Sequence, residues 1–296
     1  MSTDLSDEQV YVFDANSRWD WQTRVRELSQ YRFLLQNLVI RDLKAKYKNS
    51  ILGVLWSLLN PLALMLVFTI VFSVLSGDRA PRQYPVFVLV GLIPWRFFTG
   101  AVTSGSIAIT NNAVLVKKVY FPRELLPTAT LLSNLVNFLF GCIVMVAFLY
   151  AFRLGLTIYA LWVPVILLTQ VIFTLGLSFI LSAVTTFYRD VLMILEVIIQ
   201  AWFFLTPVFY SFDTFFGDSS TILGITFNPT QAMRWINPMA SIIDGYRTVL
   251  WGTEGSLGPV SMNPVYLLRT LIESIIILFI GYYIFIRSEH LFGEKM

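Results

Sequence analysis

Long apolar runs separated by short charged stretches make up most of this chain from residue 49 onward. A transmembrane helix needs about 20 mostly apolar residues. Six stretches meet this requirement, at about 53–75, 85–109, 128–152, 160–185, 191–210 and 265–286. The pattern therefore predicts an all-α integral membrane protein, with a six-span domain over residues 49–290 and a short cytoplasmic tail at 291–296.

Residues 211–263 interrupt this pattern between the fifth and sixth predicted spans. The segment is rich in Gly, Pro and Asn, and its two apolar pieces are too short to cross a bilayer. We expect a re-entrant helical hairpin that is covered by protein or water, because broken helices persist at membrane depth only under such cover. Asn237-Pro238 is a favourable helix start. Asp244 and Arg247, three positions apart, can pair on one helix face.

The N-terminal region has a different character. Residues 1–19 form a polar tail, and residues 20–48 are predicted to form an amphipathic helix. Its apolar residues recur at helical spacing: Trp21, Val25, Leu28, Leu35 and Val39. Such residues, backed by Arg and Lys, suit a helix that lies in the lipid headgroup layer. The alternative is a helix that packs only on loops of this protein. The region is not a cleavable signal, because the first apolar run starts near Ile51.

Composition strengthens the membrane assignment. The chain is 56% hydrophobic and only 13% charged, whereas soluble domains are about 25% charged. The net charge of +3 is too small to indicate nucleic-acid binding. The eight Lys and Arg residues between Arg18 and Lys48 favour contact with an anionic membrane surface instead. A single cysteine, Cys142, excludes a disulfide within the chain.

The distribution of basic residues predicts the orientation of the spans. If the N-terminus is cytoplasmic, 14 of the 21 Lys and Arg residues lie on cytoplasmic pieces of the chain. Cytoplasmic loops of membrane proteins carry an excess of these residues. We therefore expect both termini in the cytoplasm, residues 111–127 in a cytoplasmic loop, and residues 211–263 on the outer side.

The sequence lacks the signs of an energy source or a catalytic centre. A P-loop requires Gly-Lys, and none of the six lysines follows a glycine. One histidine, His290, and one cysteine cannot form a metal cluster, so no metal, cofactor or catalytic residue is predicted. Among the acids in the predicted spans, Glu196 should reach the headgroup layer and Glu273 should make an interfacial or buried polar contact. Such a membrane pathway must recruit a motor or let solutes flow downhill.

Residues 111–127, here called the coupling segment, form a charged stretch between the second and third predicted spans. Asn111 or Asn112 is a suitable cap for a short helix that runs toward Val119. Pro122 would end this helix or begin another turn. A short helix between two spans can dock on a soluble partner and transmit its movement to both. The alternative is a positively charged loop that only fixes topology.

Five segments of the chain carry a family resemblance. In order, they are RDLKAKYKNSILGVLWSLLNPL (41–62), GLIPWRFF (91–98), LVKKVYFPRELLP (115–127), FYRDV (187–191) and NPMASIIDGYRTVLWG (237–252). Together they resemble the membrane subunit, or permease, of ABC transporters that export O-antigen, teichoic acid or capsule polysaccharides. The resemblance covers roughly residues 20–290. It implies a bacterial inner-membrane homodimer joined to two copies of a separate ATPase, which binds ATP and Mg²⁺. It also implies a glycan substrate attached to a polyprenyl diphosphate lipid.

The resemblance further implies roles for individual positions. The coupling segment would contact the ATPase through Leu115, Val116, Lys117, Lys118, Val119, Tyr120, Phe121, Pro122, Arg123 and Glu124. The helix at the membrane surface would include Arg41, Asp42, Lys44, Lys46 and Tyr47. The outer segment would close the pathway with Asn237, Pro238, Asp244, Tyr246 and Arg247.

Aromatic residues make up 16% of the chain and suit walls along which a glycan slides. Most of them are expected in interfacial belts or facing lipid. The candidates for the substrate pathway are Trp56, Trp95, Arg96, Phe97 and Phe98. Arg96 is a charge within a span, so we expect it either to meet the diphosphate or sugar chain or to snorkel to the outer surface.

Two other function classes fit the sequence less well. An ABC exporter of a drug or a sugar-free lipid would share the span pattern, but LVKKVYFPREL and the outer hairpin fit the polysaccharide group better. A membrane acyl- or glycosyltransferase would need a polar catalytic cluster. The sequence shows no His-Asp, Glu-Glu or DxD arrangement of that kind.

Overall fold

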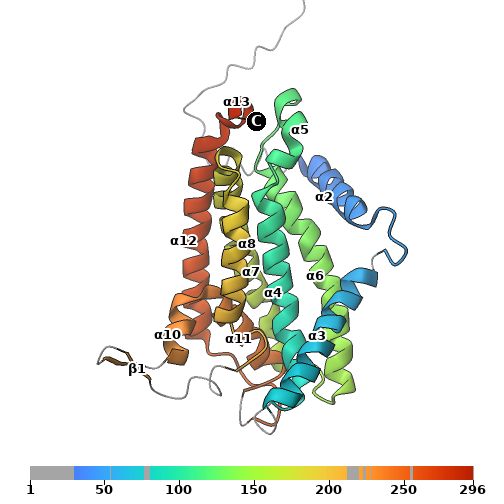
Figure 1. The fold of residues 1–296 in the computed structure, drawn as a ribbon, viewed down its shortest axis with the longest axis vertical. Helices are drawn as coiled ribbons and strands as arrows, with labels where there is room; N and C mark the ends of the chain where they lie inside the picture. Colours follow the sequence, from blue (N-terminus) through green and yellow to red (C-terminus); the bar gives the residue numbers. More distant parts are fainter. Residues whose placement is uncertain are drawn as a thin grey trace, which may run out of the picture.

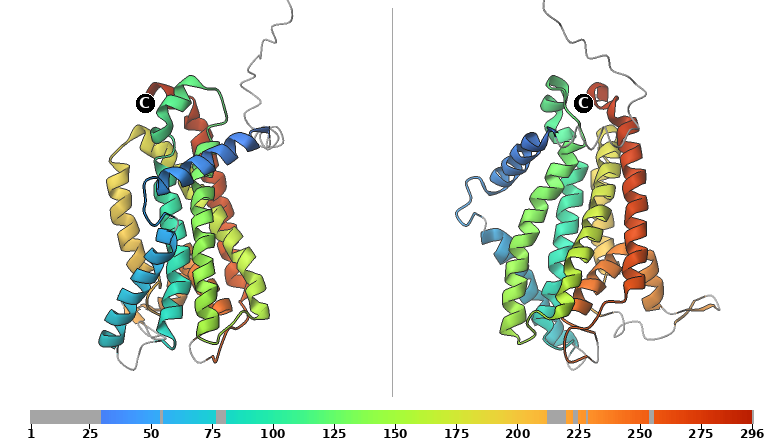
Figure 2. Two further views of the ribbon diagram at one scale, coloured as in Figure 1. Left: turned by 90° about the vertical axis from the view of Figure 1, so that its right-hand side faces the viewer. Right: turned by 180° about the vertical axis from the view of Figure 1, so that it is seen from behind.

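The computed structural model describes residues 30–53, 55–76, 81–211, 220–222, 225–227, 229–253 and 256–295. The predicted tail at 1–19 and the first part of the predicted amphipathic helix, 20–29, lie outside the described residues. The described chain is almost entirely helical, and its long helices run side by side along one axis (Figures 1 and 2). Two three-residue strands, β1 (Ser220–Ile222) and β2 (Ile225–Phe227), pair antiparallel.

Among the described residues, five helices are long and apolar enough to cross a membrane. They are α3 (Leu55–Ser76), α4 (Tyr84–Ser106), α6 (Leu125–Ala151), α7 (Val163–Phe187, after the 3-10 turn η4 at Ile158–Trp162) and α12 (Pro264–Glu289). Each overlaps a predicted span. A further apolar helix, α8 (Val191–Leu205), has only 15 residues. It extends about 22 Å, less than the roughly 30 Å of a hydrocarbon core.

The predicted fifth span, 191–210, is wrong at its end, because α8 stops at Leu205. Thr206 precedes Pro207 and is extended, with ψ 134°. A residue before proline avoids the helical region for steric reasons. The chain then turns, and Val208, Phe209 and Tyr210 are buried against the core instead of continuing the helix.

Helix α4 is the centre of the bundle. It packs on α3, α6, α7, α8 and α11. In the apolar stretch of α4, 78% of the residues are buried inside the molecule, compared with 11% in that of α3. A polar link reinforces this core: Gln170 of α7 donates from Nε2 to the carbonyl of Pro94 at 2.8 Å. Its Oε1 accepts a hydrogen bond from the Tyr246 hydroxyl at 3.1 Å, so one amide joins three helices.

Helices α7 and α12 pack very closely through two glycines. A Cβ on Gly176 would lie 2.8 Å from the Cα of Leu278, and a Cβ on Gly281 would lie 2.3 Å from the carbonyl oxygen of Gly176. Small residues let membrane helices approach until their backbones touch, which maximises packing where lipid offers no hydrophobic drive.

The bundle has two distinct ends (Figure 1). The α5 end carries α2 (Arg32–Tyr47), η3 (Thr110–Asn112), α5 (Ala113–Lys118) and α13 (Phe292–Lys295). The opposite α11 end carries α10 (Pro229–Ile236) and α11 (Pro238–Leu250). Helix α2 packs on α6, and the view from the side shows it crossing the bundle obliquely (Figure 2).

Candidate functional site

The coupling segment forms a short protrusion at the α5 end (Figure 1), and its inner face packs against other helices. Val116 and Phe121 are buried, with 5% and 3% exposure. They belong to a cluster with Leu38 of α2, Phe285 of α12 and Phe292 of α13. Hydrophobic burial on three separate elements fixes the position of the segment.

The outer face of the same segment is apolar and basic. Val114, Val119 and Tyr120 are 68%, 52% and 74% exposed. Lys117 and Lys118 are exposed beside them. The exposed valines, the tyrosine and the two lysines therefore all lie within residues 114–120.

The prediction that the side chain of Asn111 or Asn112 caps the short helix is wrong. Asn112 occupies the N-cap position of α5, but its side chain makes no capping bond. Its Nδ2 donates to the carbonyl of Ala108 at 2.7 Å, and its Oδ1 accepts from Nη1 of Arg41 at 2.8 Å. The arginine thus takes the oxygen that a cap would use, and it ties α2 to the coupling segment.

Two further contacts connect the coupling segment to α12. The Arg123 guanidinium donates to the backbone carbonyl of Glu289. Glu124 is 1% exposed, and its Oε1 lies 3.5 Å from the Tyr282 hydroxyl, which donates to it. A displacement of the segment would therefore reach α2 and α12 as well as α4 and α6, to which the segment is joined along the chain.

The predicted residues of the surface helix separate into two groups. Arg41 pairs with Asp42 at 2.8 Å, and Lys44 is exposed. Lys46 and Tyr47 instead lie at the C-terminal end of α2 and line a cavity. The Tyr47 hydroxyl donates to Oδ1 of Asn137 in α6.

At the α11 end, Asn237 starts α11 as its sequence predicted. Its Oδ1 accepts from the backbone N–H groups of Met239 and Ala240 at 3.1 and 3.3 Å, which satisfies donors that a helix start leaves free. The same side chain accepts from Nε1 of Trp202 at 2.8 Å and donates to Oγ1 of Thr206 at 2.9 Å. It therefore joins α11 to the end of α8.

Arg247 is the most deeply buried cation at this end, with 5% exposure. Its Nη2 donates to the carbonyl of Val208 at 2.6 Å, and its Nη1 donates to that of Tyr210 at 3.3 Å. The guanidinium carbon lies 3.7 Å from the centroid of the Phe87 ring. Gly91 provides the space, because a Cβ there would lie 2.7 Å from the Val208 oxygen and 2.8 Å from Nη2. The arginine thereby fastens the turn after α8 to α4 and α11.

The predicted pair of Asp244 with Arg247 is wrong. Asp244 pairs with Arg234 of α10, at 3.0 Å from Oδ2 to Nε. The reason is that backbone carbonyls already surround the Arg247 guanidinium, while Arg234 approaches the aspartate from the neighbouring helix. Glu273 makes the polar contact expected of it, with Arg269 one turn earlier at 3.6 Å.

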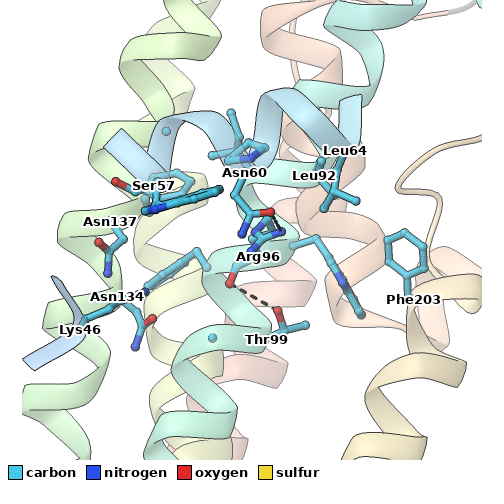
Figure 3. A pocket seen from close by; sticks show the side chains of 18 of the residues that line it. Lys46, Ser57, Asn60, Leu64, Leu92, Arg96, Thr99, Asn134, Asn137 and Phe203 are labelled. Atoms are coloured by element: carbon cyan, nitrogen blue, oxygen red, sulfur yellow. Dashed lines mark hydrogen bonds between the residues drawn. The ribbon is translucent and has the colours of Figure 1, made fainter. Parts of the chain in front are cut away.

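A cavity of about 550 Å³ lies between α2, α3, α4 and α6, with Phe203 of α8 at one side (Figure 3). Its polar lining comes from four helices: Lys46, Tyr47, Ser57, Asn60, Arg96, Thr99, Asn134 and Asn137. Arg96 points into this space beside Asn60, and its Nη1 donates to Oδ1 of Asn60 at 3.1 Å (Figure 3).

The predicted pathway residues divide at this cavity. Trp56, Trp95, Arg96 and Phe97 line it. Phe98 is fully buried and stacks on Phe173, with 5.6 Å between ring centroids. The sequence reasoning missed the three asparagines, Asn60, Asn134 and Asn137, although polar amides within apolar spans are themselves a signal of a wet or packed interior.

The described residues do not assemble a metal site. No three His, Cys, Asp or Glu side chains among them lie together as metal ligands would. The arrangement therefore consists of an exposed apolar and basic surface at the α5 end, a tightly packed α11 end, and a polar cavity between α2, α3, α4 and α6.

Comparison with known proteins agrees with this architecture. The ABC-2 type transporter family matches residues 34–251. The O-antigen export system permease protein RfbA of Myxococcus xanthus is 38% identical over 227 residues, which are 77% of this chain and 84% of the relative. Two proteins of the same name from Klebsiella pneumoniae are 30% and 31% identical over 265 residues, which are 88% of this chain and 94% of each relative. The chain therefore belongs to the family of ABC-2 type transporter membrane proteins.

Proposed function

We propose that this chain is the permease of an ATP-driven exporter that moves a polysaccharide on a polyprenyl diphosphate lipid, such as O-antigen, across the cytoplasmic membrane. The relatives named as O-antigen export permeases support this substrate class. The observation that carries the proposal is the coupling segment: it packs on α2, α12 and α13 within the molecule and yet exposes Val119, Tyr120 and the two lysines.

The exposed stretch of the coupling segment is the docking surface for a separate ATPase, which binds ATP and Mg²⁺. Two exposed apolar side chains can enter a groove of that partner, while Lys117 and Lys118 pair with acidic groups at its rim. The contacts of Arg41, Arg123 and Glu124 then pass the partner's movement to α2 and α12. This chain takes no part in hydrolysis.

The working unit is a homodimer of six-span subunits. Helix α8 serves as the fifth of these spans although it is short, and α10 and α11 re-enter the outer side to close the pathway. Exposed apolar side chains along α3, including Leu59, Leu66 and Ile70, suit a second copy as well as lipid. The excess of basic residues on α2 and the coupling segment supports a cytoplasmic α5 end.

The alternative substrates are teichoic acid or capsule chains. A drug or simple lipid is a weaker alternative, because the relatives that match most of the chain are named for O-antigen export.

Deletion of the gene, followed by analysis of lipid-linked glycan, tests the proposed function. We expect glycan to be lost from the cell surface and to accumulate on its carrier lipid inside the cell. Complementation with the intact chain should restore export. Normal surface glycan in the deletion strain would contradict the proposal.

A further inference from the structure

The cavity between α2, α3, α4 and α6 has a polar, positively charged interior. Lys46 enters it from α2 and Arg96 from α4. None of the described residues that line it is an aspartate or a glutamate. The partly enclosed position of the Lys46 ammonium, and secondly the positive charge of Arg96, lower its pKa. Two like charges therefore converge on one space without an acidic side chain to offset them.

This arrangement is costly in a membrane protein unless an anion joins it. Charged side chains at membrane depth are expensive, and they usually mark a polar pathway or a ligand site. Arg96 lies ten residues before the end of α4, about 15 Å along the helix. The hydrogen bond that the structure gives its side chain, to Asn60, engages one of five guanidinium donors.

The lining also has the chemistry of a phosphate site. A guanidinium presents parallel donors that match phosphate oxygens, and an ammonium adds a point charge. The Tyr47 hydroxyl and the amides of Asn60, Asn134 and Asn137 surround them. The remaining lining is largely aromatic and apolar, which suits a ligand with an attached lipid or sugar.

The shape of the cavity indicates approach from one side. Lys46 and Trp56 are exposed, whereas Trp95 and Phe97 are 5% and 3% exposed. The exposed lining residues thus lie on α2 and α3, and the buried ones lie on α4. Beside the exposed part of the lining, α3 presents an exposed apolar face, against which a lipid chain can remain while its headgroup enters.

We propose that this cavity binds the phosphate-bearing headgroup of a membrane lipid, with Arg96 and Lys46 as its anion-binding residues. The identification of that headgroup with the diphosphate of the exported lipid rests on the proposed function. A phospholipid of the surrounding bilayer has the same chemistry, and the test distinguishes the two.

The test is a binding titration on the purified full-length chain in phosphatidylcholine nanodiscs. The probes are farnesyl diphosphate, phosphatidylglycerol and inorganic pyrophosphate. Because Trp56 and Trp95 line the cavity, tryptophan fluorescence reports occupancy, and Trp56→Phe should reduce the signal. We expect farnesyl diphosphate to bind more tightly than pyrophosphate, which lacks the lipid chain.

Substitutions locate the binding. Arg96→Gln should weaken it about tenfold or more, and Lys46→Gln should weaken it a few-fold. Arg96→Lys keeps the charge and should fall between Arg96→Gln and the native chain, which separates anion binding from a folding defect. The matched control is Arg189→Gln, which removes an exposed arginine outside the cavity and should change nothing.

The outcomes are distinct. Preference for the prenyl diphosphate, lost in Arg96→Gln, supports the substrate lipid as the ligand. Equal binding of phosphatidylglycerol, also lost in Arg96→Gln, supports the site but assigns it to a bilayer phospholipid. No binding, or binding that Arg96→Gln and Lys46→Gln leave intact, overturns the proposal. The assay needs neither ATP nor export, so the proposed function can stand when this site fails.

Discussion

The two ends of the bundle differ in the exposure of their basic side chains: Arg247 is buried at the α11 end, whereas Lys117 and Lys118 are exposed at the α5 end. At the α11 end, Arg247 is 5% exposed, bonded to two backbone carbonyls and stacked on Phe87. At the α5 end, Lys117 and Lys118 are exposed beside apolar side chains. The cation at the α11 end thus has its partners within the chain, whereas the α5 end presents a mixed apolar and basic surface. Under the proposed function, this difference means that the chain closes the pathway with its own residues and receives the driving movement from its partner.

Removing Arg247 should have the largest effect. Arg247→Ala leaves the carbonyls of Val208 and Tyr210 without their donor and removes the contact with Phe87. The loss should be about 2–5 kcal/mol of stability, seen as a lower thermal midpoint in fluorescence-detected gel filtration. The matched control is Arg234→Ala, which breaks a partly exposed pair and should cost about 1 kcal/mol or less. Equal thermal midpoints for the two variants would contradict the claim that the buried Arg247 contributes more to stability than the partly exposed Arg234.

Reversing charge at the α5 end should abolish export without unfolding the chain. Lys117→Glu combined with Lys118→Glu puts two negative charges on the docking surface, where like charges would repel the partner. Single alanine changes should be tolerated better. The readouts are ATP-driven transport and thermal midpoint, and Leu257→Asp at the opposite end, 97% exposed, is the control. Normal transport by the double variant would contradict the assignment of this surface.

A smaller effect is expected at Gly91. Gly91→Ala places a methyl group 2.7 Å from the Val208 oxygen and 2.8 Å from the Arg247 guanidinium. Overpacking of this kind costs about 1–3 kcal/mol, so the thermal midpoint should fall by less than in Arg247→Ala. Gly258→Ala is a fair control, since no heavy atom lies within 4 Å of its added Cβ. An unchanged midpoint in Gly91→Ala would mean that Arg247 is held more loosely than the structure shows.

The smallest effect is expected from Arg41. Arg41→Ala removes the link between α2 and Asn112, an exposed hydrogen bond that is worth about 0.5–1.5 kcal/mol. Transport should fall a few-fold while ATPase binding, measured by co-purification, is retained. Loss of co-purification would show that Arg41 acts on docking itself and not on the transmission of movement.

Local properties of the sequence predicted most of the fold. The apolar spans are read from length and composition, and Asn237-Pro238 is a local helix start. The early end of α8 was also readable, since Pro207 restricts Thr206. The predicted pair of Asp244 with Arg247 fails because residues on other elements bind both side chains. Arg234 of α10 pairs with Asp244, and the carbonyls of Val208 and Tyr210 accept from Arg247.

The candidate site was less accessible to sequence reasoning for the same reason. The sequence marks Arg96 as a charge within a span, but the cavity residues Lys46, Asn60 and Asn134 come from three other helices. The coupling segment contacts α12 through Arg123 with Glu289 and through Glu124 with Tyr282. Both pairs join residues more than 150 positions apart. Spacing along the chain gives no information about such pairs.

The most direct measurement of the account is ATP-driven transport of lipid-linked glycan in proteoliposomes that contain this chain with or without its ATPase partner. We expect no ATP hydrolysis by the chain alone, hydrolysis and transport by the complex, and no transport by the complex with Lys117→Glu and Lys118→Glu. Robust hydrolysis by the purified chain alone, or undiminished transport by that variant complex, would contradict the proposed function.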